Sequence, residues 1–294
     1  MNPGPLDIAK SRIAVVMNTA SGSCDASAEG IVESILKDSG LSDFRIWCTD
    51  AAGMGASFKE ALQTDPAILI VLGGDGTIRT GAELCTSAGP LLIPLPGGTM
   101  NMLPKALYGT RSWQEALRDT LADPVVKSVS GGEVSGKRFY IAAIVGAPAL
   151  WAKAREALRE GDLQSAVGEG VNAFQQMFAS KVMYSFREGE RDEAAAVAII
   201  CPLISDVLND SAPSFEAAAV SLESAGDVLA LASSGAVGKW REDDHVAVTK
   251  TKTVSASAEE DIPVILDGES VELGREVEIT FVPEAFKALV SRAQ

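Results

Sequence analysis

The stretch VLGGDGTIRT, residues 71–80, decides how the first part of this chain is expected to fold. It begins inside an apolar run, residues 67–72, that is typical of a buried β-strand, and it continues with GGDGT (73–77), which has three glycines, one aspartate and one threonine. Glycine has no Cβ atom, so the backbone at Gly73 and Gly74 can adopt a positive φ or approach another group very closely. The stretch is therefore either a tight turn or a loop whose amides bind an anion at the start of the next helix.

Asp75 is the unusual member of this loop, because a bare carboxylate repels phosphate. It suits a phosphate site if Mg²⁺ lies between the two negative groups, or if it accepts a hydrogen bond from a ribose hydroxyl. Thr77 could add a hydroxyl donor. In the alternative interpretation Asp75 caps the helix that follows a glycine-rich turn, and GGDG alone favours that alternative.

Two more polar loops follow strand-like segments and favour a phosphate site. Residues 91–96 lead into GGTMN (97–101), and residues 12–17 lead into NTASG (18–22). The carboxyl ends of parallel strands meet at one edge of a sheet, where open α/β sheets bind their ligands. Three such loops are difficult to attribute to turn chemistry alone.

The order of segments predicts two domains. Strand-like segments 12–17, 44–49, 67–72 and 91–94 alternate with helical patterns at 25–37, at 56–62 and from Ile78 onward. This alternation indicates an α/β domain with a parallel sheet over residues 1–125. Residues 126–282 are expected to form a β-rich sandwich domain, interrupted by two helical stretches, 148–160 and 163–180. A closing helix over 283–294 is expected to pack back on the first domain.

The predicted strands of the second domain are short and numerous, as in an antiparallel sandwich. They are expected at 125–130, 132–135, 138–145, 182–186, 195–201, 217–222, 227–232, 245–250, 253–258, 262–266 and 277–281.

Composition limits the classes of partner. The 294 residues carry a formal net charge of −15, which argues against nucleic acid and against electrostatic adhesion to anionic lipid. A nucleotide bound with a divalent cation remains compatible with that charge. The first residues lack the apolar core of an export signal, and the longest apolar run, 194–204, is too short to span a bilayer. Four widely spaced cysteines are typical of reduced thiols in a cytoplasmic protein.

The segment ILDGESVEL, residues 265–273, has the pattern of a β-hairpin, since Asp-Gly between alternating apolar residues is a strong turn signal. Taken locally, Asp267 and Glu269 would be solvated turn residues.

GGDGT (73–77), PLPGGTMN (94–101) and LDGE (266–269), in this order and spacing, resemble the diacylglycerol kinase catalytic-domain family. This family includes bacterial lipid kinases and sphingosine and ceramide kinases, and its fold is related to that of NAD kinases. NTASG stands where the family has Asn-Pro-x-Ser-Gly. The resemblance extends over nearly the whole chain and implies two domains with ATP in the cleft between them.

The resemblance also implies roles for individual residues. It implies a nucleotide pocket formed by Asn18, Ser21, Gly22 and Thr49. Phosphate and the surroundings of Mg²⁺ would be held by Gly73, Gly74, Asp75, Gly76 and Thr77, with Gly98, Thr99 and Asn101 opposite. Asp75 would be the metal ligand. Asp267 would be the general base that takes the proton of the lipid hydroxyl, with Glu269 nearby.

The resulting expectation is an ATP- and Mg²⁺-dependent kinase of lipid metabolism, a phosphotransferase with an alcohol group as acceptor, such as the hydroxyl of diacylglycerol. It would be cytoplasmic, would touch the membrane surface transiently and would bind no nucleic acid; a homodimer is left open. Two alternatives stand beside it. One is an NAD kinase-like enzyme, although the Gly-Ser-Thr-Ala-Tyr element of such enzymes is absent. The other is a nucleotide-binding regulator without turnover.

Departures from the family pattern motivate the regulator alternative. Met102 stands where many members have an aspartate that supports the base, and Ile78-Arg79 replaces a common Leu-Asn pair. Thr19 replaces the usual proline, and Ala142 or Ala143 stands where a strand asparagine is common. Met102 in particular puts the proton relay in doubt.

Overall fold

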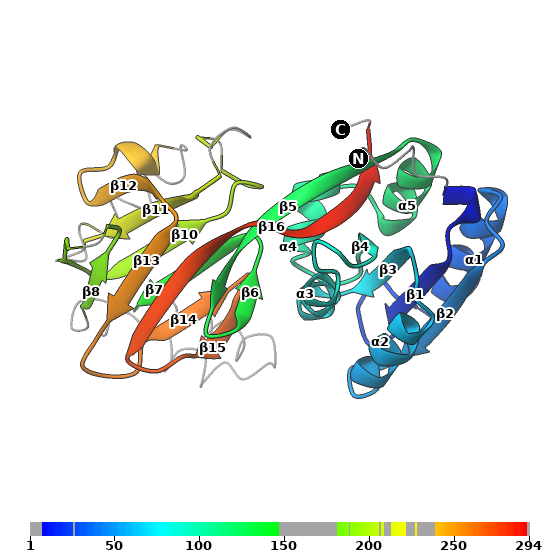
Figure 1. Ribbon diagram of the computed structural model, residues 1–294, viewed down its shortest axis with the longest axis horizontal. Helices are drawn as coiled ribbons and strands as arrows, with labels where there is room; N and C mark the ends of the chain where they lie inside the picture. Colours follow the sequence, from blue (N-terminus) through cyan, green and yellow to red (C-terminus); the bar gives the residue numbers. More distant parts are fainter. Residues whose placement is uncertain are drawn as a thin grey trace. The chain divides into compact units, whose positions relative to one another are not determined.

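A computed structural model describes residues 8–25, 27–146, 181–187, 189–205, 207–208, 213–221, 227 and 239–292 (Figure 1). They form two compact units. The first contains the described residues of Met1–Val129 and Glu284–Gln294, and the second contains those of Ser130–Pro283. The predicted helices at 148–160 and 163–180, and the predicted strand at 227–232 apart from Asp227, lie outside the described residues.

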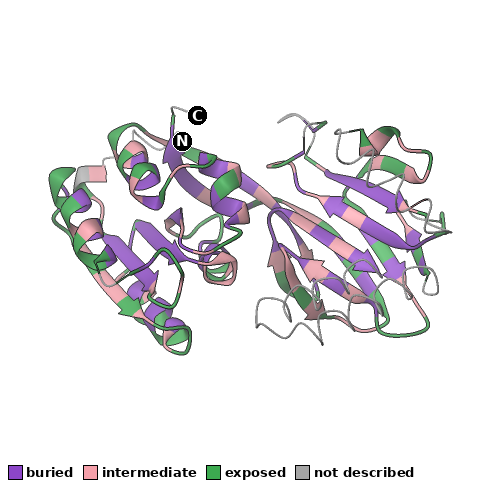
Figure 2. Ribbon diagram, turned by 180° about the vertical axis from the view of Figure 1, so that it is seen from behind, coloured by how far each residue is buried: buried purple, intermediate pink, exposed green. Residues whose placement is uncertain are grey.

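The first unit is built on a parallel sheet in the order β2-β1-β3-β4-β16 (Figure 1). Its strands are β1 (Ile13–Asn18), β2 (Phe44–Thr49), β3 (Ile68–Gly73), β4 (Leu91–Pro96) and the end of β16 (Glu276–Ser291). β3 is buried at every position, and Figure 2 shows the burial along these strands. Continuous burial is expected of a central parallel strand with helices on both faces.

The strand order decides which face of the sheet each connecting helix of this unit covers. They are η1 (Ile8–Lys10), α1 (Ala28–Asp38), α2 (Met54–Gln63), α3 (Asp75–Leu84), α4 (Met102–Tyr108) and α5 (Trp113–Ala122). The chain runs from β1 to β2 in one direction and from β2 through β3 to β4 in the other. Right-handed crossovers therefore place α1 on one face and α2 and α3 on the other.

Helix α5 has no counterpart among the helices predicted from the sequence. The helix begins with a capping box, in which the Ser112 hydroxyl accepts from the Glu115 backbone N–H and the Glu115 carboxylate accepts from the Ser112 N–H. The spacing S-x-x-E at 112–115 is a known start signal and could have located it.

The second unit is β-rich and antiparallel, as predicted. One sheet runs through β16, β13, β8 and β9, and the other has the order β12-β11-β10-β7-β14-β15. The bounds are β7 (Ala142–Gly146), β8 (Val182–Ser185), β9 (Asp192–Ala194), β10 (Ala196–Ile200), β11 (Phe215–Val220), η3 (Trp240–Glu242), β12 (Val246–Thr251), β13 (Thr253–Ser257), β14 (Pro263–Leu266) and β15 (Glu269–Glu272). Buried residues of both sheets form one core, in which the rings of Phe139 and Phe215 stack at 5.9 Å. A sandwich of this kind buries one face of each sheet.

Two of the predicted strands are in fact one. β5 (Pro124–Val134) continues through the glycines that suggested a break, and it pairs with β6 (Lys137–Phe139). A Cβ on Gly131 would lie 2.5 Å from the Phe139 carbonyl oxygen, and one on Gly132 would lie 2.2 Å from the Phe139 ring. The glycines therefore admit a close neighbour and do not end the strand.

The predicted closing helix over 283–294 is wrong. The segment is the second part of β16, and Ala288 pairs in parallel with Leu92 of β4. Ala285, Phe286 and three of the next four residues are buried, which is more burial than one face of a helix provides. Pairing with the sheet outweighs the helix propensity of this alanine- and leucine-containing segment.

Candidate functional site

The strand order places three polar loops at one edge of the first unit's sheet. β1 and β3 are neighbours, and the chain leaves them in opposite directions, so their carboxyl ends form a topological switch point. Open α/β sheets bind ligands at such a point. NTASG follows β1, GGDGT follows β3, and GGTMN follows the next strand, β4.

The first two loops are joined across the switch point by side chains. The Asn18 amide Nδ2 donates to Thr77 Oγ1 at 3.0 Å. The Gly74 backbone N–H donates to Ser21 Oγ at 3.1 Å. Both contacts link residues more than 50 positions apart, so the structure brings together residues that the sequence could connect only by pattern.

Asp75 links the second loop to the third. Its Oδ2 accepts from the Asn101 N–H at 2.9 Å, and its Oδ1 accepts from the Met102 N–H at 2.6 Å. These amides lie at the start of α4, where backbone N–H groups lack partners within the helix and carry partial positive charge. The backbone N–H groups at the start of α4 thus stabilise the negative charge of Asp75, and this stabilisation does not require a metal.

Asn101 fixes the conformation of the third loop. It is buried and left-handed, with φ 51° and ψ 47°. Its side chain accepts from the Gly98 N–H at 2.8 Å and donates to the Gly98 carbonyl at 2.7 Å. Asparagine is among the few residues that tolerate this backbone conformation, so Asn101 serves the loop both by its backbone and by its amide.

The glycines of the two loops pack against each other and differ in what they permit. A Cβ on Gly97 would lie 2.9 Å from the Gly73 Cα, and one on Gly98 would lie 2.7 Å from the Gly74 Cα. Gly74 itself has an ordinary extended backbone, φ −78° and ψ 177°, and a Cβ there would meet no atom closer than 3.9 Å. Gly73, Gly97 and Gly98 are therefore needed for packing, whereas the fold does not require glycine at position 74.

The other predicted residues of this site occupy its margins. Thr49 ends β2, its carbonyl accepts from the Thr19 N–H at 2.8 Å, and its hydroxyl lies where a Cβ of Gly53 would be. Gly22 and Thr99 are exposed, and Gly76 is partly buried in the first turn of α3.

Asp267 and Glu269 belong to the second unit. Asp267 and Gly268 have φ of 49° and 87° and form the two-residue turn between β14 and β15, so the predicted hairpin is confirmed. Glu269 is partly buried and pairs with Leu266. The solvated state that the hairpin suggested for Asp267 is wrong, because this residue is only 8% exposed.

The Asp267 carboxylate is held by three backbone donors. Its Oδ2 accepts from the Tyr140 N–H at 2.8 Å, and its Oδ1 accepts from the N–H groups of Ile141 and Ala142 at 2.8 and 3.0 Å. It thereby ties the β14–β15 turn to the start of β7. No sequence signal indicated this contact, since its partners are more than 120 positions away.

Two of the departures from the family pattern acquire a structural role. Met102 supplies one of the two amides that hold Asp75, a role that its backbone performs whatever its side chain. Ala142 supplies one of the three amides that hold Asp267. Arg79 forms a helical ion pair with Glu83, Nε to Oε1, at 4.0 Å.

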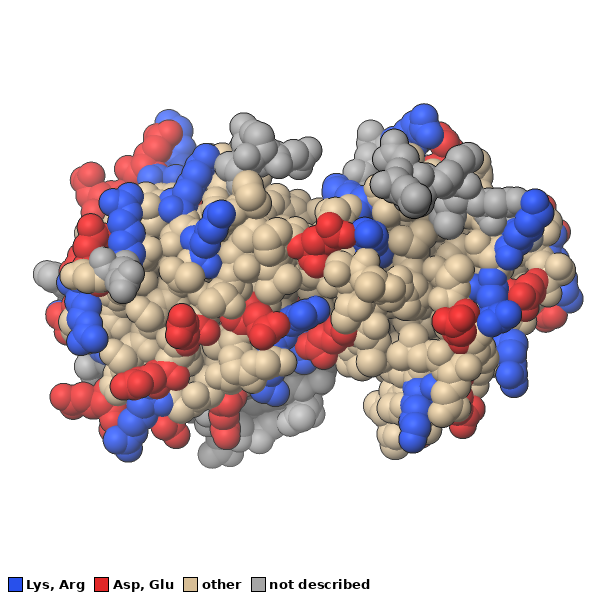
Figure 3. Space-filling model, in the orientation of Figure 1, with Lys and Arg blue, Asp and Glu red and all other residues tan. Residues whose placement is uncertain are grey.

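No cluster of three or more His, Cys, Asp or Glu side chains that could hold a metal occurs among the residues that the structure describes. In that same part of the chain, no helix is both long and apolar enough to cross a bilayer. On the face drawn in Figure 3, acidic and basic side chains are interspersed.

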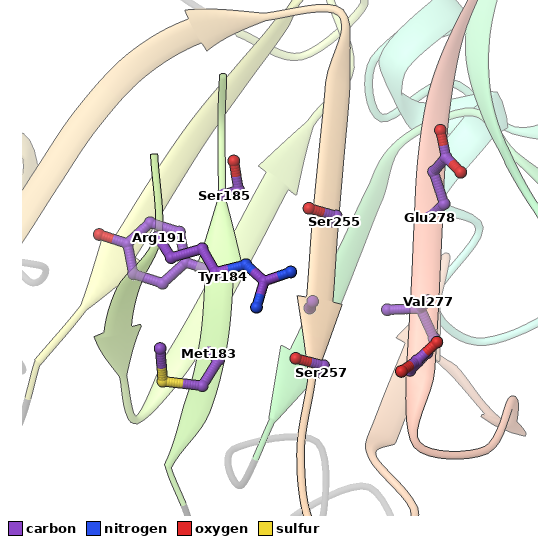
Figure 4. A pocket seen from close by; sticks show the side chains of 10 residues that line it. Met183, Tyr184, Ser185, Arg191, Ser255, Ser257, Val277 and Glu278 are labelled. Atoms are coloured by element: carbon purple, nitrogen blue, oxygen red, sulfur yellow. The ribbon is translucent and has the colours of Figure 1, made fainter. Parts of the chain in front are cut away.

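The second unit carries a polar pocket of about 390 Å³ on its β16-β13-β8 sheet (Figure 4). Ser255 and Ser257 line it from β13, and Glu278 lines it from β16. Arg191 extends its guanidinium toward β13. These side chains suit a polar group better than an acyl chain.

Comparison with known proteins gives the following matches. Residues 12–134 match the family model described as "Diacylglycerol kinase catalytic domain". No curated protein sequence matches the chain.

Three solved structures from Bacillus anthracis str. Sterne share the fold, two described as proposed diacylglycerol kinases and one as a diacylglycerol kinase. The first proposed kinase has a TM-score of 0.73 and 19% identity, covering 100% of this chain and 99% of its own. The diacylglycerol kinase has a TM-score of 0.67 and 19% identity, with coverage of 97% and 98%. The second proposed kinase has a TM-score of 0.71 and 20% identity, with coverage of 97% and 99%.

Proposed function

Because residues 12–134 belong to the diacylglycerol kinase catalytic-domain family, we propose that this kinase transfers the γ-phosphoryl group of ATP to a lipid hydroxyl. The observation that carries the proposal is the interlocked set of three loops at the switch point, joined by Asn18, Ser21, Asp75 and Asn101. Phosphoryl transfer depends mainly on positioning and on neutralising charge, and preorganised loops of this kind supply both.

Gly74 is the position at which we expect the nucleotide phosphates to approach the backbone. Its glycine has no role in packing, unlike Gly73, Gly97 and Gly98, so the absence of a side chain there leaves room for a ligand. Position 74 also precedes the first turn of α3, where the helix dipole favours an anion. Asn18, Thr77 and Ser21 hold the loop in position for it.

Mg²⁺ fits this site as an ion that arrives with the nucleotide. Such ions are commonly held by one or two carboxylates together with substrate phosphates and water. Asp75 would be the carboxylate, through lone pairs that its two backbone contacts leave available. When bound, the ion would supply positive charge against the phosphates.

Asp267 is the proposed general base for the lipid hydroxyl. Its orientation is fixed by the N–H groups of residues 140–142, and a fixed carboxylate is a requirement for proton transfer at hydrogen-bond distance. The same three donors also engage its oxygens, which weakens it as a proton acceptor. This feature, together with Met102 in place of the family aspartate, favours a second candidate, a nucleotide-binding regulator without turnover.

The lipid would be reached at the membrane surface through peripheral contact, and diacylglycerol is the acceptor we propose first. Transfer of radiolabelled phosphate from ATP to a panel of lipid hydroxyls in mixed micelles, with and without Mg²⁺, tests the proposal. Mg²⁺-dependent labelling of one lipid class supports a kinase. Stabilisation by MgATP in a thermal-shift assay without any labelling would support the regulator, and the absence of both would refute nucleotide binding.

A further inference from the structure

Besides the polar pocket of the second unit, a polar cavity lies in the first unit, beside the GGTMN loop. It has a volume of about 320 Å³. It lies between α4, the helix that follows the GGTMN loop, and the start of α5. Asn101 and Lys105 line it from the α4 side, and Arg111, Ser112 and Trp113 line it from the α5 side.

The cavity is lined by basic side chains in a chain that is acidic as a whole. Its charged lining residues are Lys105 and Arg111, and neither aspartate nor glutamate is among the described residues that line it. Arg111 is partly compensated, since its Nε lies 3.2 Å from the Asp119 carboxylate and its Nη1 donates to the Tyr108 carbonyl. Lys105 is exposed, and within the described ranges no carboxylate forms an ion pair with it. Glu115 also lies next to the cavity, where its carboxylate accepts from the N–H and the hydroxyl of Ser112. Among the described residues of the lining, Lys105 is therefore the charge without a carboxylate partner, and such an ammonium in a chain of charge −15 is where an anion is expected to collect.

Residues with hydrogen-bonding side chains form part of the remaining walls. Ser23 and Thr110, which carry hydroxyls, and Gln114, which carries an amide, line the same cavity. A guanidinium, an ammonium and neutral donors are the set that recognises a phosphate group.

The cavity is connected to the candidate nucleotide site through backbone contacts. The Ser23 N–H donates to the Gly97 carbonyl at 2.9 Å, and the Trp113 indole N–H donates to the Ser23 carbonyl at 3.2 Å. Asn101, which fixes the third loop, is shared by the loop and the cavity wall. A ligand in the cavity would therefore contact the residues that hold this loop.

We propose that this cavity is a second anion site, which binds a phosphate group on Lys105 and Arg111, separate from the nucleotide phosphates at Gly74. The chemistry that the walls recognise is common to free phosphate, to a small phosphate monoester and to a phosphate-bearing lipid headgroup. The site does not depend on the proposed kinase activity.

Calorimetric titration tests the site with inorganic phosphate and with glycerol 3-phosphate at constant ionic strength. Lys105→Gln is expected to weaken phosphate binding by about tenfold, the ratio that corresponds to about 1.4 kcal/mol. Lys59→Gln is the matched control, because Lys59 is an exposed lysine of α2 outside this cavity. The phosphate affinity of the Lys59→Gln variant should equal that of the wild type. Equal binding by the Lys105 and Lys59 variants would overturn the proposal.

Gly74→Val separates the two anion sites. It is expected to abolish stabilisation by MgATP and to leave phosphate binding unchanged, whereas Lys105→Gln should retain stabilisation by MgATP. If Gly74→Val removed phosphate binding, the anion would sit in the glycine loops and the proposal would fail, whatever the outcome for the kinase.

Co-sedimentation with vesicles distinguishes the sources of the phosphate group. Binding to phosphatidylcholine vesicles that contain phosphatidate, reduced in Lys105→Gln, would assign the site to a lipid headgroup. Calorimetric binding without vesicle binding would assign it to a free phosphate compound, and the absence of both would refute it.

Discussion

Asp267→Asn is the substitution for which the structure and the sequence predict different outcomes. Asparagine suits a two-residue hairpin turn as well as aspartate does, so the local pattern predicts an intact fold. In the structure, however, both carboxylate oxygens accept backbone N–H groups. The asparagine amide has only one oxygen, so its NH₂ group would face a backbone N–H group that now donates to the second carboxylate oxygen.

The cost follows from the contact to Tyr140. If the asparagine oxygen keeps the hydrogen bonds from the N–H groups of Ile141 and Ala142, the Tyr140 N–H, now 2.8 Å from Oδ2, loses its acceptor. The loss is costly because residue 267 is only 8% exposed. Hydrogen bonds to a charged group contribute about 1.5–3 kcal/mol, and an unsatisfied buried donor costs a similar amount. We expect the free energy of unfolding of the second unit to fall by about 2–3 kcal/mol, which lowers its melting temperature by roughly 4–12 °C.

Urea and thermal unfolding followed by circular dichroism measure this change. Asp261→Asn provides the matched control, because Asp261 lies in the same unit with its side chain 83% exposed and its Arg275 partner 3.9 Å away. Exposed pairs of this kind contribute about 0.2–1 kcal/mol. A loss for Asp267→Asn no larger than that of the control would refute the reasoning from the three N–H donors.

The same variant bears on catalysis when it is assayed well below its melting temperature. If Asp267 is the general base, turnover at saturating ATP should fall by about 10²–10⁴-fold, while stabilisation by MgATP persists. Turnover equal to that of the wild type would leave Asp267 with a structural role only.

Four further substitutions test other contacts. Gly74→Val should leave the free energy of unfolding within about 0.5 kcal/mol of wild type but abolish thermal stabilisation by MgATP. Gly98→Ala should lower the free energy of unfolding by about 1–3 kcal/mol, because the alanine Cβ would lie 2.7 Å from the Gly74 Cα. Asp75→Ala should lower the stability of the first unit in urea by about 1–2 kcal/mol, since it removes the acceptor for two amides at the start of α4. Glu216→Gln should be destabilising near neutral pH and progressively less so below about pH 4.5.

The sign for Glu216 follows from its surroundings. Burial alone would raise the pKa of this carboxyl, but hydrogen bonds from Arg241 and Ser205 outweigh burial, and its pKa is lowered. A lowered folded-state pKa contributes stability above the unfolded-state pKa and loses it as the pH falls through the folded value. A stability difference between wild type and Glu216→Gln that did not shrink in acid would contradict this assignment.

Unchanged stability in Gly98→Ala would contradict the close packing of the two glycine loops. For Asp75→Ala, a loss that appeared only in the presence of Mg²⁺ and nucleotide would indicate a metal ligand without the structural role. Both variants are measured by the same urea titration as the wild type.

Local sequence was sufficient for strands β1 to β4 of the first unit's sheet and for the loops that follow β1, β3 and β4. Continuous apolar runs such as that of β3 leave little alternative to a buried parallel strand, and glycine-rich loops directly after such strands must lie at their carboxyl edge. The expectation that the loops of Asn18, Gly74 and Asp75 lie together depended only on this short-range information, whereas the role of Asn18 in a nucleotide pocket came from the family resemblance. The structure brings these residues to one edge of the sheet.

Tertiary structure decided the features that depend on distant partners. The chain end 284–291 became a strand because β4 offers it a pairing edge nearly 200 positions away, and the glycines of β5 continue a strand because Phe139 packs on them. Asp267 was recognisable as a turn residue from its neighbours, but its burial was set by amides more than 120 positions earlier in the chain. Periodicity and turn propensity report a residue's own backbone preferences, whereas these outcomes depend on which distant groups need a hydrogen-bond partner or a surface to cover.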